Sequence, residues 1–151
     1  MIMKIIAENR KARHLYTVLD TMEAGIALQG TEIKSLRNHA ASIDQSFGKV
    51  EKGEMWIYDM HIAPYDHGNI CNHDPKRPRK LLLHKREIIR WGSRSLERGL
   101  TIVPLRVYIN ERGKVKVEIA LVKPKKVYDR RKDIQEREEE RQLRRAVKEK
   151  M

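Results

Sequence analysis

The chain has 151 residues, 40% of them hydrophobic, which is enough for one modest core. Its 33 Lys and Arg against 21 Asp and Glu give a net charge of +12, so a polyanionic partner is expected, with nucleic acid as the first candidate. No run of 18 apolar residues and no signal peptide is recognisable, and a single cysteine excludes an intramolecular disulfide. We therefore expect a soluble cytoplasmic protein that does not enter a membrane.

The first part of the chain is predicted to contain strands and then a short helix. Residues 15–28 are rich in β-branched and apolar side chains, which favours two consecutive strands with Gly25 as a bend or bulge in their path. Residues 31–38 favour a helix, with Thr31 as its N-terminal cap.

The middle of the chain is predicted to fold as a hairpin, a loop and a second helix. Residues 46–50 and 55–58 flank a turn and form the predicted hairpin. Residues 64–79 combine Pro, Gly, Asn and Asp and are expected to be a loop. Residues 84–98 have a helical pattern that Gly99 ends.

The most regular pattern follows this second helix. Apolar residues occupy every second position over 103–109 and again over 115–121, which is the period of a half-buried strand. The turn sequence Asn-Glu-Arg-Gly at 110–113 joins them, so an antiparallel hairpin is predicted. Pro104 has no amide hydrogen, which predicts a sheet edge or a bulge at that point.

These elements indicate a mainly β fold with short helices, an OB-like antiparallel β-barrel over residues 1–122. Periodicity alone does not separate an OB barrel from another small barrel. Residues 123–151 form a basic C-terminal tail with twelve Lys and Arg and seven Asp and Glu. Because the tail has good helix formers but no continuous apolar stripe, we expect it to be disordered alone and helical against a partner.

Two basic clusters are candidates for contact with RNA. Residues 9–14 place three fixed cations and a histidine just ahead of Tyr16, which suits phosphate neutralisation and base stacking. The charges of this first cluster are explained equally well by a solvent-exposed segment that leads into the following strand and contacts no RNA. Residues 74–86 place six Lys and Arg around the apolar triplet 81–83, and like charges at this density favour an RNA contact over an ordinary solvated face.

Two acidic residues are conspicuous in so basic a protein. Glu23 and Glu32 could pair with an arginine beside RNA or accept a hydrogen bond from a base or a 2′-hydroxyl. From the residues alone, the structural reading is favoured, in which such a carboxylate forms an ion pair or supports a helix carrying Lys34 and Arg37.

Four potential metal ligands, His61, His67, Cys71 and His73, lie within thirteen residues. A zinc site or a Cys–His catalytic pair could use these residue types, but the spacing lacks the paired ligands of a zinc knuckle. Solvated loop histidines are the simpler interpretation, so no metal and no cofactor is expected. No phosphate-binding loop, dinucleotide fingerprint or nucleophile elbow is present.

Several sequence blocks, in their order and spacing, resemble the SsrA-binding protein (small protein B, SmpB) family over nearly the whole chain. They are Asn9–His14 with Tyr16, Glu23–Ile26, Gly30–Arg37, Ile62–Tyr65, Asn72–Pro75, Arg79–His84, Gly99–Pro104, and Lys125–Lys126 with Tyr128–Arg131.

The resemblance implies an OB-type barrel that binds the tRNA-like domain of transfer-messenger RNA (tmRNA, SsrA RNA). It further implies that the protein delivers this RNA to stalled ribosomes in trans-translation and catalyses no reaction. The protein is expected to be a monomer that binds RNA one to one. The positions that match the family's recognition residues are Asn9, Glu23, Leu82 and His84. Together with the basic clusters, the predicted RNA-binding set is Asn9, Arg10, Lys11, Arg13, His14, Glu23, Lys34, Arg37, Arg77, Arg79, Lys80, Leu82 and His84.

For the tail, the resemblance implies a helix in the empty messenger channel that signals to the small-subunit decoding centre. Pro124 stands where the family usually has Gly, and it fixes φ at the junction between barrel and tail. Arg130 replaces the usual Lys, which keeps the charge but changes its geometry. The predicted ribosome-contacting residues are Lys125, Lys126, Tyr128, Asp129, Arg130 and Arg131.

A generic single-strand-binding barrel is the alternative that composition leaves open. Such a protein stacks successive bases on exposed aromatic side chains. Only 5% of the residues here are aromatic, which favours contacts to phosphates and to the shape of a folded RNA.

Overall fold

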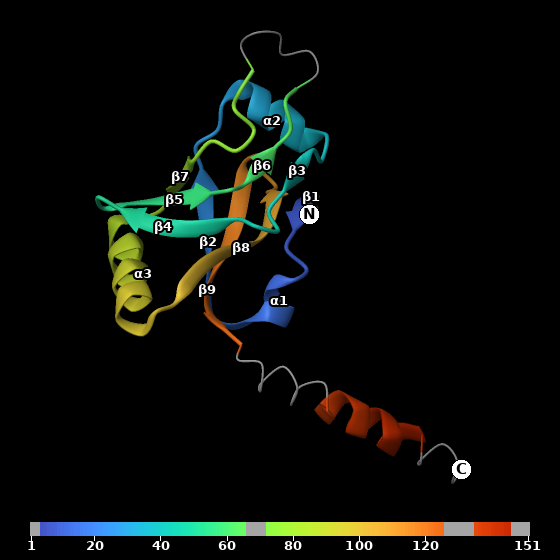
Figure 1. Ribbon diagram of the computed structural model, residues 1–151. Coiled ribbons are helices and arrows are strands. Elements are labelled where there is room, and N and C mark those ends of the chain that lie inside the picture. The colour runs from blue at the N-terminus through green and yellow to red at the C-terminus, as the bar shows by residue number, and fades with distance from the viewer. Residues whose placement is uncertain (1–3, 66–71, 126–134, 146–151) are drawn as a thin grey trace.

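A computed structural model describes residues 4–65, 72–125 and 135–145 (Figure 1). These residues form an antiparallel β structure with short helices. The strands are β1 (Lys4–Glu8), β2 (Tyr16–Ile26), β3 (Ala41–Ser42), β4 (Phe47–Glu51), β5 (Glu54–Tyr58), β6 (His61–Ile62), β7 (Arg79–Leu82), β8 (Thr101–Ile109) and β9 (Val115–Pro124). The described residues also form the helices α1 (Ala12–Leu15), α2 (Gly30–Arg37) and α3 (Lys85–Arg98), and residues 135–145 are helical as well.

Six of the strands pair side by side in a closed circuit, in which the last strand pairs with the first. From β8 the sheet runs through β4, β5, β7, β2 and β9, and β9 pairs with β8 again. The contact between β8 and β4 is narrow, with Gly48 opposite Ile102 as the only paired residues. Strand β1 pairs with the other end of β8. Such a circuit of antiparallel strands is consistent with an OB-like fold.

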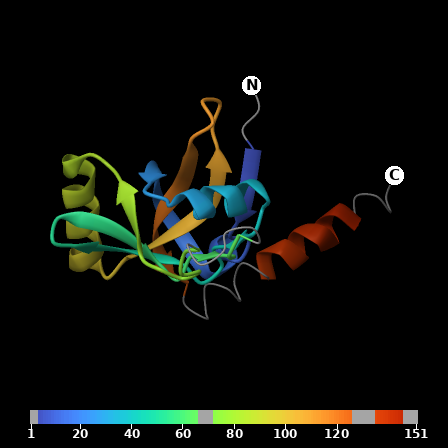
Figure 2. The ribbon, with the colours of Figure 1, turned by 90° about the horizontal axis from the view of Figure 1, so that it is seen from above.

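Apolar side chains from alternate positions of these strands fill the interior. Met55 and Ile57 of β5, Leu81 of β7 and Val117 of β9 are all completely buried. Helix α3 adds Trp91, which is equally buried. Helix α2 crosses one end of the barrel and α3 lies along its side, as Figures 1 and 2 show. The two helices thus cover apolar residues that the strands would otherwise leave exposed.

The two predicted hairpins are confirmed. Strands β4 and β5 pair with each other, and so do β8 and β9. The register of β8 shifts between Pro104 and Arg106, which is the irregularity expected where proline cannot donate a hydrogen bond. In the β8–β9 turn, Asn110 accepts backbone hydrogen bonds from Arg112 and Lys114, and Gly113 has a φ of 75°.

Other expectations about local structure are wrong. Residues 15–28 do not form two strands, because β2 is one continuous strand and its register shift lies between Val18 and Asp20 rather than at Gly25. Thr31 is not the cap of α2. The capping position is Gln29, whose backbone N–H donates to the Glu32 side chain at 2.8 Å. The sequence also gave no indication of the short helix α1.

Strand β9 continues two residues beyond the expected end of the barrel. Pro124 lies opposite Tyr16 in the pairing with β2, and the Lys125 backbone N–H donates to the Leu15 carbonyl at 3.0 Å. Proline is compatible with this position because β9 ends there. The backbone as far as Lys125 is therefore attached to the barrel.

Candidate nucleic-acid interface

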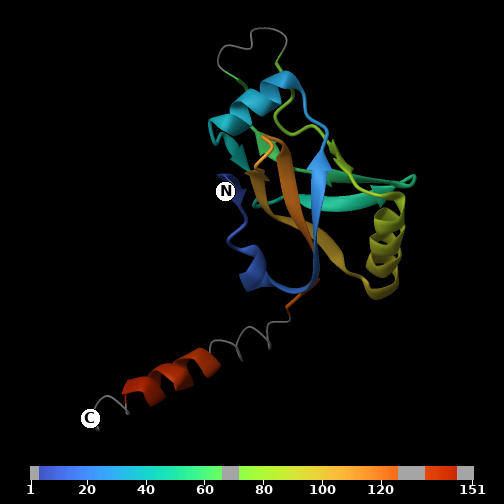
Figure 3. The ribbon, with the colours of Figure 1, turned by 180° about the vertical axis from the view of Figure 1, so that it is seen from behind.

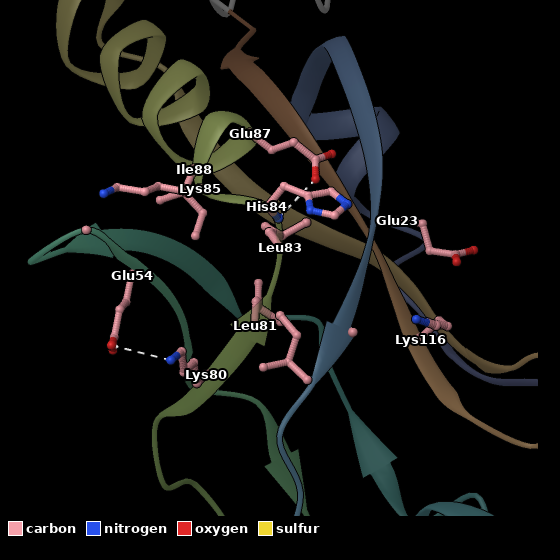
Figure 4. Close-up of a pocket in the computed structure, with 13 residues that line it drawn as sticks. Glu23, Glu54, Lys80, Leu81, Leu83, His84, Lys85, Glu87, Ile88 and Lys116 are labelled. Atoms are coloured by element: carbon pink, nitrogen blue, oxygen red, sulfur yellow. Dashed lines mark hydrogen bonds and ion pairs between the residues drawn. The ribbon is translucent and has the colours of Figure 1, made fainter.

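A hollow of about 610 Å³ opens between β2, β7, the start of α3 and the β4–β5 turn (Figure 4). Four of the predicted RNA-binding residues, Glu23, Lys80, Leu82 and His84, line it. In Figure 4, Glu23 lies across strand β2 from His84. The fold thus brings together residues that are about 60 positions apart in the sequence, because β2 and β7 are neighbours in the sheet.

Successive side chains of β7 point to opposite faces of the sheet, so only one of its two leucines is exposed at the hollow. Leu81 points into the core and is fully buried, whereas Leu82 is 52% exposed. Gly25 of β2 lies opposite Leu82, and a Cβ at Gly25 would be 3.2 Å from the Leu82 Cβ atom. The absence of a side chain at Gly25 therefore allows the close approach that holds Leu82 at this edge.

Several charged side chains surround this exposed leucine. Lys80 forms an ion pair of 3.3 Å with Glu54 across β5 and β7, and both side chains are about two-fifths exposed. Lys85 and Lys116 also line the hollow. Glu87 accepts a hydrogen bond of 3.1 Å from the His84 backbone N–H, which fixes the start of α3. The hollow thus combines cations for phosphates with one exposed apolar side chain.

Glu23 is held by a residue on a different strand. The Tyr108 hydroxyl of β8 donates to its Oε2 atom, although β9 lies between the two strands. Tyr108 is 5% exposed, and burial together with this hydrogen bond raises the pKa of its hydroxyl far above the ordinary value. The hydroxyl therefore remains a donor throughout the neutral pH range.

A buried carboxylate organises the segment that leads into β7. Glu32 of α2 accepts hydrogen bonds from Arg77, with an Nη2–Oε1 distance of 2.5 Å, and from Arg79. Burial acts to raise the pKa of Glu32, but the hydrogen bonds from Arg77, the Gln29 backbone and Arg79 outweigh it and hold the pKa below the usual value. The carboxylate is thus ionised between two guanidinium groups.

This geometry corrects the prediction for Arg79. Its side chain is completely buried, and it donates to Glu32 and, at 2.6 Å, to the Met60 carbonyl. A side chain with no exposed surface has no contact to offer an RNA, so its role is structural. Arg77 is 26% exposed and shares Glu32, so most of its guanidinium is also committed within the protein. For Glu32 the structural interpretation is confirmed.

The family can be assigned with this geometry in view. A family model described as SmpB protein matches residues 6–149. The chain belongs to the SmpB protein family. The SsrA-binding protein of Moorella thermoacetica is 54% identical over 146 residues, which are 97% of this chain and 94% of that protein. The SsrA-binding protein of Pelotomaculum thermopropionicum is 53% identical over 151 residues, which are 100% of this chain and 98% of its length.

A solved structure supports the same family. It is presented as "tmRNA-SmpB: a journey to the center of the bacterial ribosome". Its chain is 51% identical to this one and superposes with a TM-score of 0.67, covering 80% of this chain and 84% of its own. The family resemblance inferred from sequence blocks is therefore confirmed.

The structure does not bring all four family-matching positions of this SmpB chain together. Glu23, Leu82 and His84 share the large hollow, but Asn9 lines a separate one of about 280 Å³ beside α1 and the start of β4. Asn9 is buried, and its Nδ2 atom donates to the Pro104 carbonyl at 3.3 Å. An RNA that contacted all four residues would have to bind at both hollows of the barrel.

The remaining predicted cations lie away from the large hollow. Helix α1 and helix α3 lie at opposite sides of the barrel, as Figure 3 shows from behind. Lys34 extends over the Tyr65 ring at 5.3 Å, and the Arg37 carbonyl accepts from the Lys4 ammonium at 3.5 Å. The exposed predicted cations outside the hollow, with the histidine beside them, are Arg10, Lys11, Arg13, His14, Lys34 and Arg37.

Sequence reasoning missed Lys116 and Tyr108. Lys85 belongs to the predicted basic cluster 74–86, although it was not included in the predicted RNA-binding set. Lys116 lies opposite Gly25 in the register of β2 and β9, so only the strand pairing brings it to the hollow. Tyr108 alternates with core residues of β8, which predicted an outward side chain, but its contact with Glu23 depends on the order of three strands. No local sequence signal identifies such a contact.

The predicted histidine-rich loop is only partly described. His67 and Cys71 lie outside the described residues. His73 is buried, which corrects its interpretation as a solvated histidine, and both ring nitrogens are occupied. Its Nε2 atom lies 2.8 Å from the Ile62 carbonyl, which can only accept, so Nε2 carries the proton and Nδ1 accepts from the Thr31 hydroxyl at 2.9 Å. Within the described ranges, no group of three potential metal ligands occurs.

Of the predicted tail contacts, only Lys125 is described. The other five, Lys126, Tyr128, Asp129, Arg130 and Arg131, lie outside the described residues. Residues 135–145 form a helix in which every side chain is exposed. The expectation that the tail orders only against a partner stays a prediction. In the part of the chain that the structure covers, no helix is both long and apolar enough to cross a membrane.

Proposed function

We propose that this protein binds the tRNA-like domain of tmRNA and delivers it to stalled ribosomes in trans-translation. The observation that carries the proposal is the match to the SmpB family over residues 6–149, because it spans the barrel and nearly all of the tail. The charge of +12 and the cation-lined hollow beside Glu23 are the physical features that suit an RNA partner.

The proposal assigns different tasks to the barrel and the tail. The barrel selects the RNA through Glu23, Leu82 and His84 at the large hollow and through Asn9 at the other site. The basic tail, residues 123–151, enters the messenger channel and contacts the decoding centre. We further propose that the protein acts in the cytoplasm as a monomer, one per RNA, and catalyses no reaction.

Competition binding at several salt concentrations tests the choice of RNA. Labelled tRNA-like domain of tmRNA is displaced by unlabelled tmRNA, by an ordinary tRNA and by an unstructured RNA of equal length. Contacts to phosphates weaken steeply as salt rises, whereas recognition of base edges and shape survives. We expect a preference for tmRNA that persists at high salt. Equal displacement by all three RNAs would show that only charge is recognised.

A further inference from the structure

The recognition carboxylate of the proposed function, Glu23, projects from the barrel beside two hollows. It lines the 610 Å³ hollow and also a smaller one of about 300 Å³, which Tyr108 and residues 110–112 complete. A free glutamate on such a surface would sample several rotamers and would lose that freedom on binding a ligand. The hydrogen bond from Tyr108 removes most of this freedom in advance.

Tyr108 is itself fixed by its neighbours on the outer face of β8 and β9. The Arg106 guanidinium lies over the Tyr108 ring at 5.8 Å. Arg106 also forms an ion pair of 2.7 Å with Glu118, which lies opposite Glu23 in the pairing of β9 and β2. The ring is buried, so its hydroxyl has little room to move. A short chain of contacts therefore runs from β9 through Arg106 and Tyr108 to the Glu23 carboxylate.

The hydrogen bond uses only one of the two carboxylate oxygens. Tyr108 donates to Oε2, and no hydrogen bond to Oε1 occurs among the described residues. An ionised carboxylate accepts hydrogen bonds and donates none, so Oε1 can recognise a group that carries hydrogen, such as a base amino or imino group or a ribose 2′-hydroxyl. A phosphate, which also only accepts, would be repelled from this position.

We propose that Tyr108 is a positioning residue that holds Glu23 so that its free oxygen accepts a hydrogen bond from a base edge or a 2′-hydroxyl of the bound RNA. This inference rests on the proposed function, since Glu23 must contact the RNA. It adds a positioning residue to the proposed recognition site and limits the group that Glu23 contacts to a hydrogen-bond donor of the RNA. Tyr108 is almost completely buried and contributes through Glu23 rather than by touching RNA.

A double-mutant cycle on the full chain tests the inference. The variants are Glu23→Ala, Tyr108→Phe and the double variant, and the measurement is the Kd for the tRNA-like domain of tmRNA at fixed salt. Tyr108→Phe removes only the hydroxyl and keeps the ring, so we expect roughly a three- to tenfold weaker Kd in the native background, as for loss of one hydrogen bond. In the Glu23→Ala background the same change should have no effect.

Tyr58→Phe is the matched control. Glu51 raises the pKa of the Tyr58 hydroxyl, so this change likewise removes a tyrosine hydroxyl that interacts with a glutamate, here in the β4–β5 hairpin. We expect RNA affinity to stay unchanged, while both phenylalanine variants keep a cooperative unfolding transition. A loss in Tyr58→Phe equal to that in Tyr108→Phe would mean that the effect is general destabilisation, and would overturn the inference.

The outcomes separate this inference from the function on which it rests. If Glu23→Ala binds tmRNA as the native protein does, the recognition role of Glu23 is wrong. If Glu23→Ala weakens binding but Tyr108→Phe does not, only the positioning role is wrong. If Tyr108→Phe weakens binding equally in both backgrounds, Tyr108 acts independently of Glu23 and the inference fails.

Discussion

Glu32 and Arg79 are 47 positions apart in the sequence and form an ion pair in which both side chains are completely buried. The pair connects α2 to the first residue of β7, and Arg77 adds a second guanidinium to the same carboxylate. Since β7 also carries Lys80 and Leu82, this buried pair fixes the strand that forms one wall of the large hollow.

Replacing Glu32 by Gln should strongly destabilise the fold. The change keeps the size of the side chain but leaves the buried Arg79 without its counter-charge, which typically costs about 3–5 kcal/mol. Denaturant unfolding would measure the loss. Glu54→Gln is the control, because it breaks an ion pair with Lys80 that is substantially exposed and should cost less than about 1 kcal/mol. Equal effects in the two variants would contradict the structural role of Glu32.

Acidification should reduce stability partly through Glu32. Its pKa in the folded protein lies below the value of about 4.3 for an unfolded chain, so its contribution is fully present above that pH and is lost as the pH falls through the folded pKa. The difference in unfolding free energy between the native protein and Glu32→Gln should therefore be constant from neutral pH down to about 5 and shrink below about 4. A difference that grew on acidification would have the wrong sign.

Replacing Gly48 by Ala should weaken the closure of the barrel. A Cβ atom at Gly48 would lie 2.7 Å from the Ile102 Cγ2 atom, and the β-branched Ile102 side chain cannot rotate away easily. We expect a loss of about 1–3 kcal/mol and faster amide exchange where β4 meets β8. Gly30→Ala is the control, since nothing lies within 4 Å of its new methyl group at the start of α2. It should be neutral or slightly stabilising.

Alanine substitutions at the adjacent residues Leu81 and Leu82 should have different effects on RNA affinity and on the free energy of unfolding. Leu82→Ala removes an exposed side chain at the hollow and should weaken tmRNA binding while changing the unfolding free energy by less than about 0.5 kcal/mol. Leu81→Ala truncates a fully buried neighbour and should cost about 2–5 kcal/mol. Binding assays and denaturant unfolding on both variants check this. Unchanged RNA affinity in Leu82→Ala would remove Leu82 from the proposed interface.

Truncation after Lys125 should separate the proposed tasks of barrel and tail. This end point keeps Pro124 paired with Tyr16 and keeps the hydrogen bond from Lys125 to Leu15. We expect affinity for tmRNA to remain within a few-fold, because the proposed recognition residues belong to the barrel, while peptide tagging on stalled ribosomes is abolished. Loss of RNA binding by the truncated chain would contradict this division.

The sequence by itself determined the features that depend on short-range chemistry. Alternating apolar residues predicted both hairpins, Pro104 predicted the bulge in β8, and Gly99 marked the end of α3, where it has a φ of 61°. Composition indicated a nucleic-acid partner, and the ordered sequence blocks identified the SmpB family. Each of these signals is read from neighbouring residues or from the chain as a whole.

Only the tertiary structure decided which predicted residues share a site. Arg79 and Lys80 are adjacent cations in the sequence, but the pairing of β7 buries the first against Glu32 and exposes the second at the hollow. The contact between Tyr108 and Glu23 likewise depends on the order of β8, β9 and β2. A carboxylate attracts whichever donor the fold places beside it, so a local pattern can name the charged residues but cannot assign their partners.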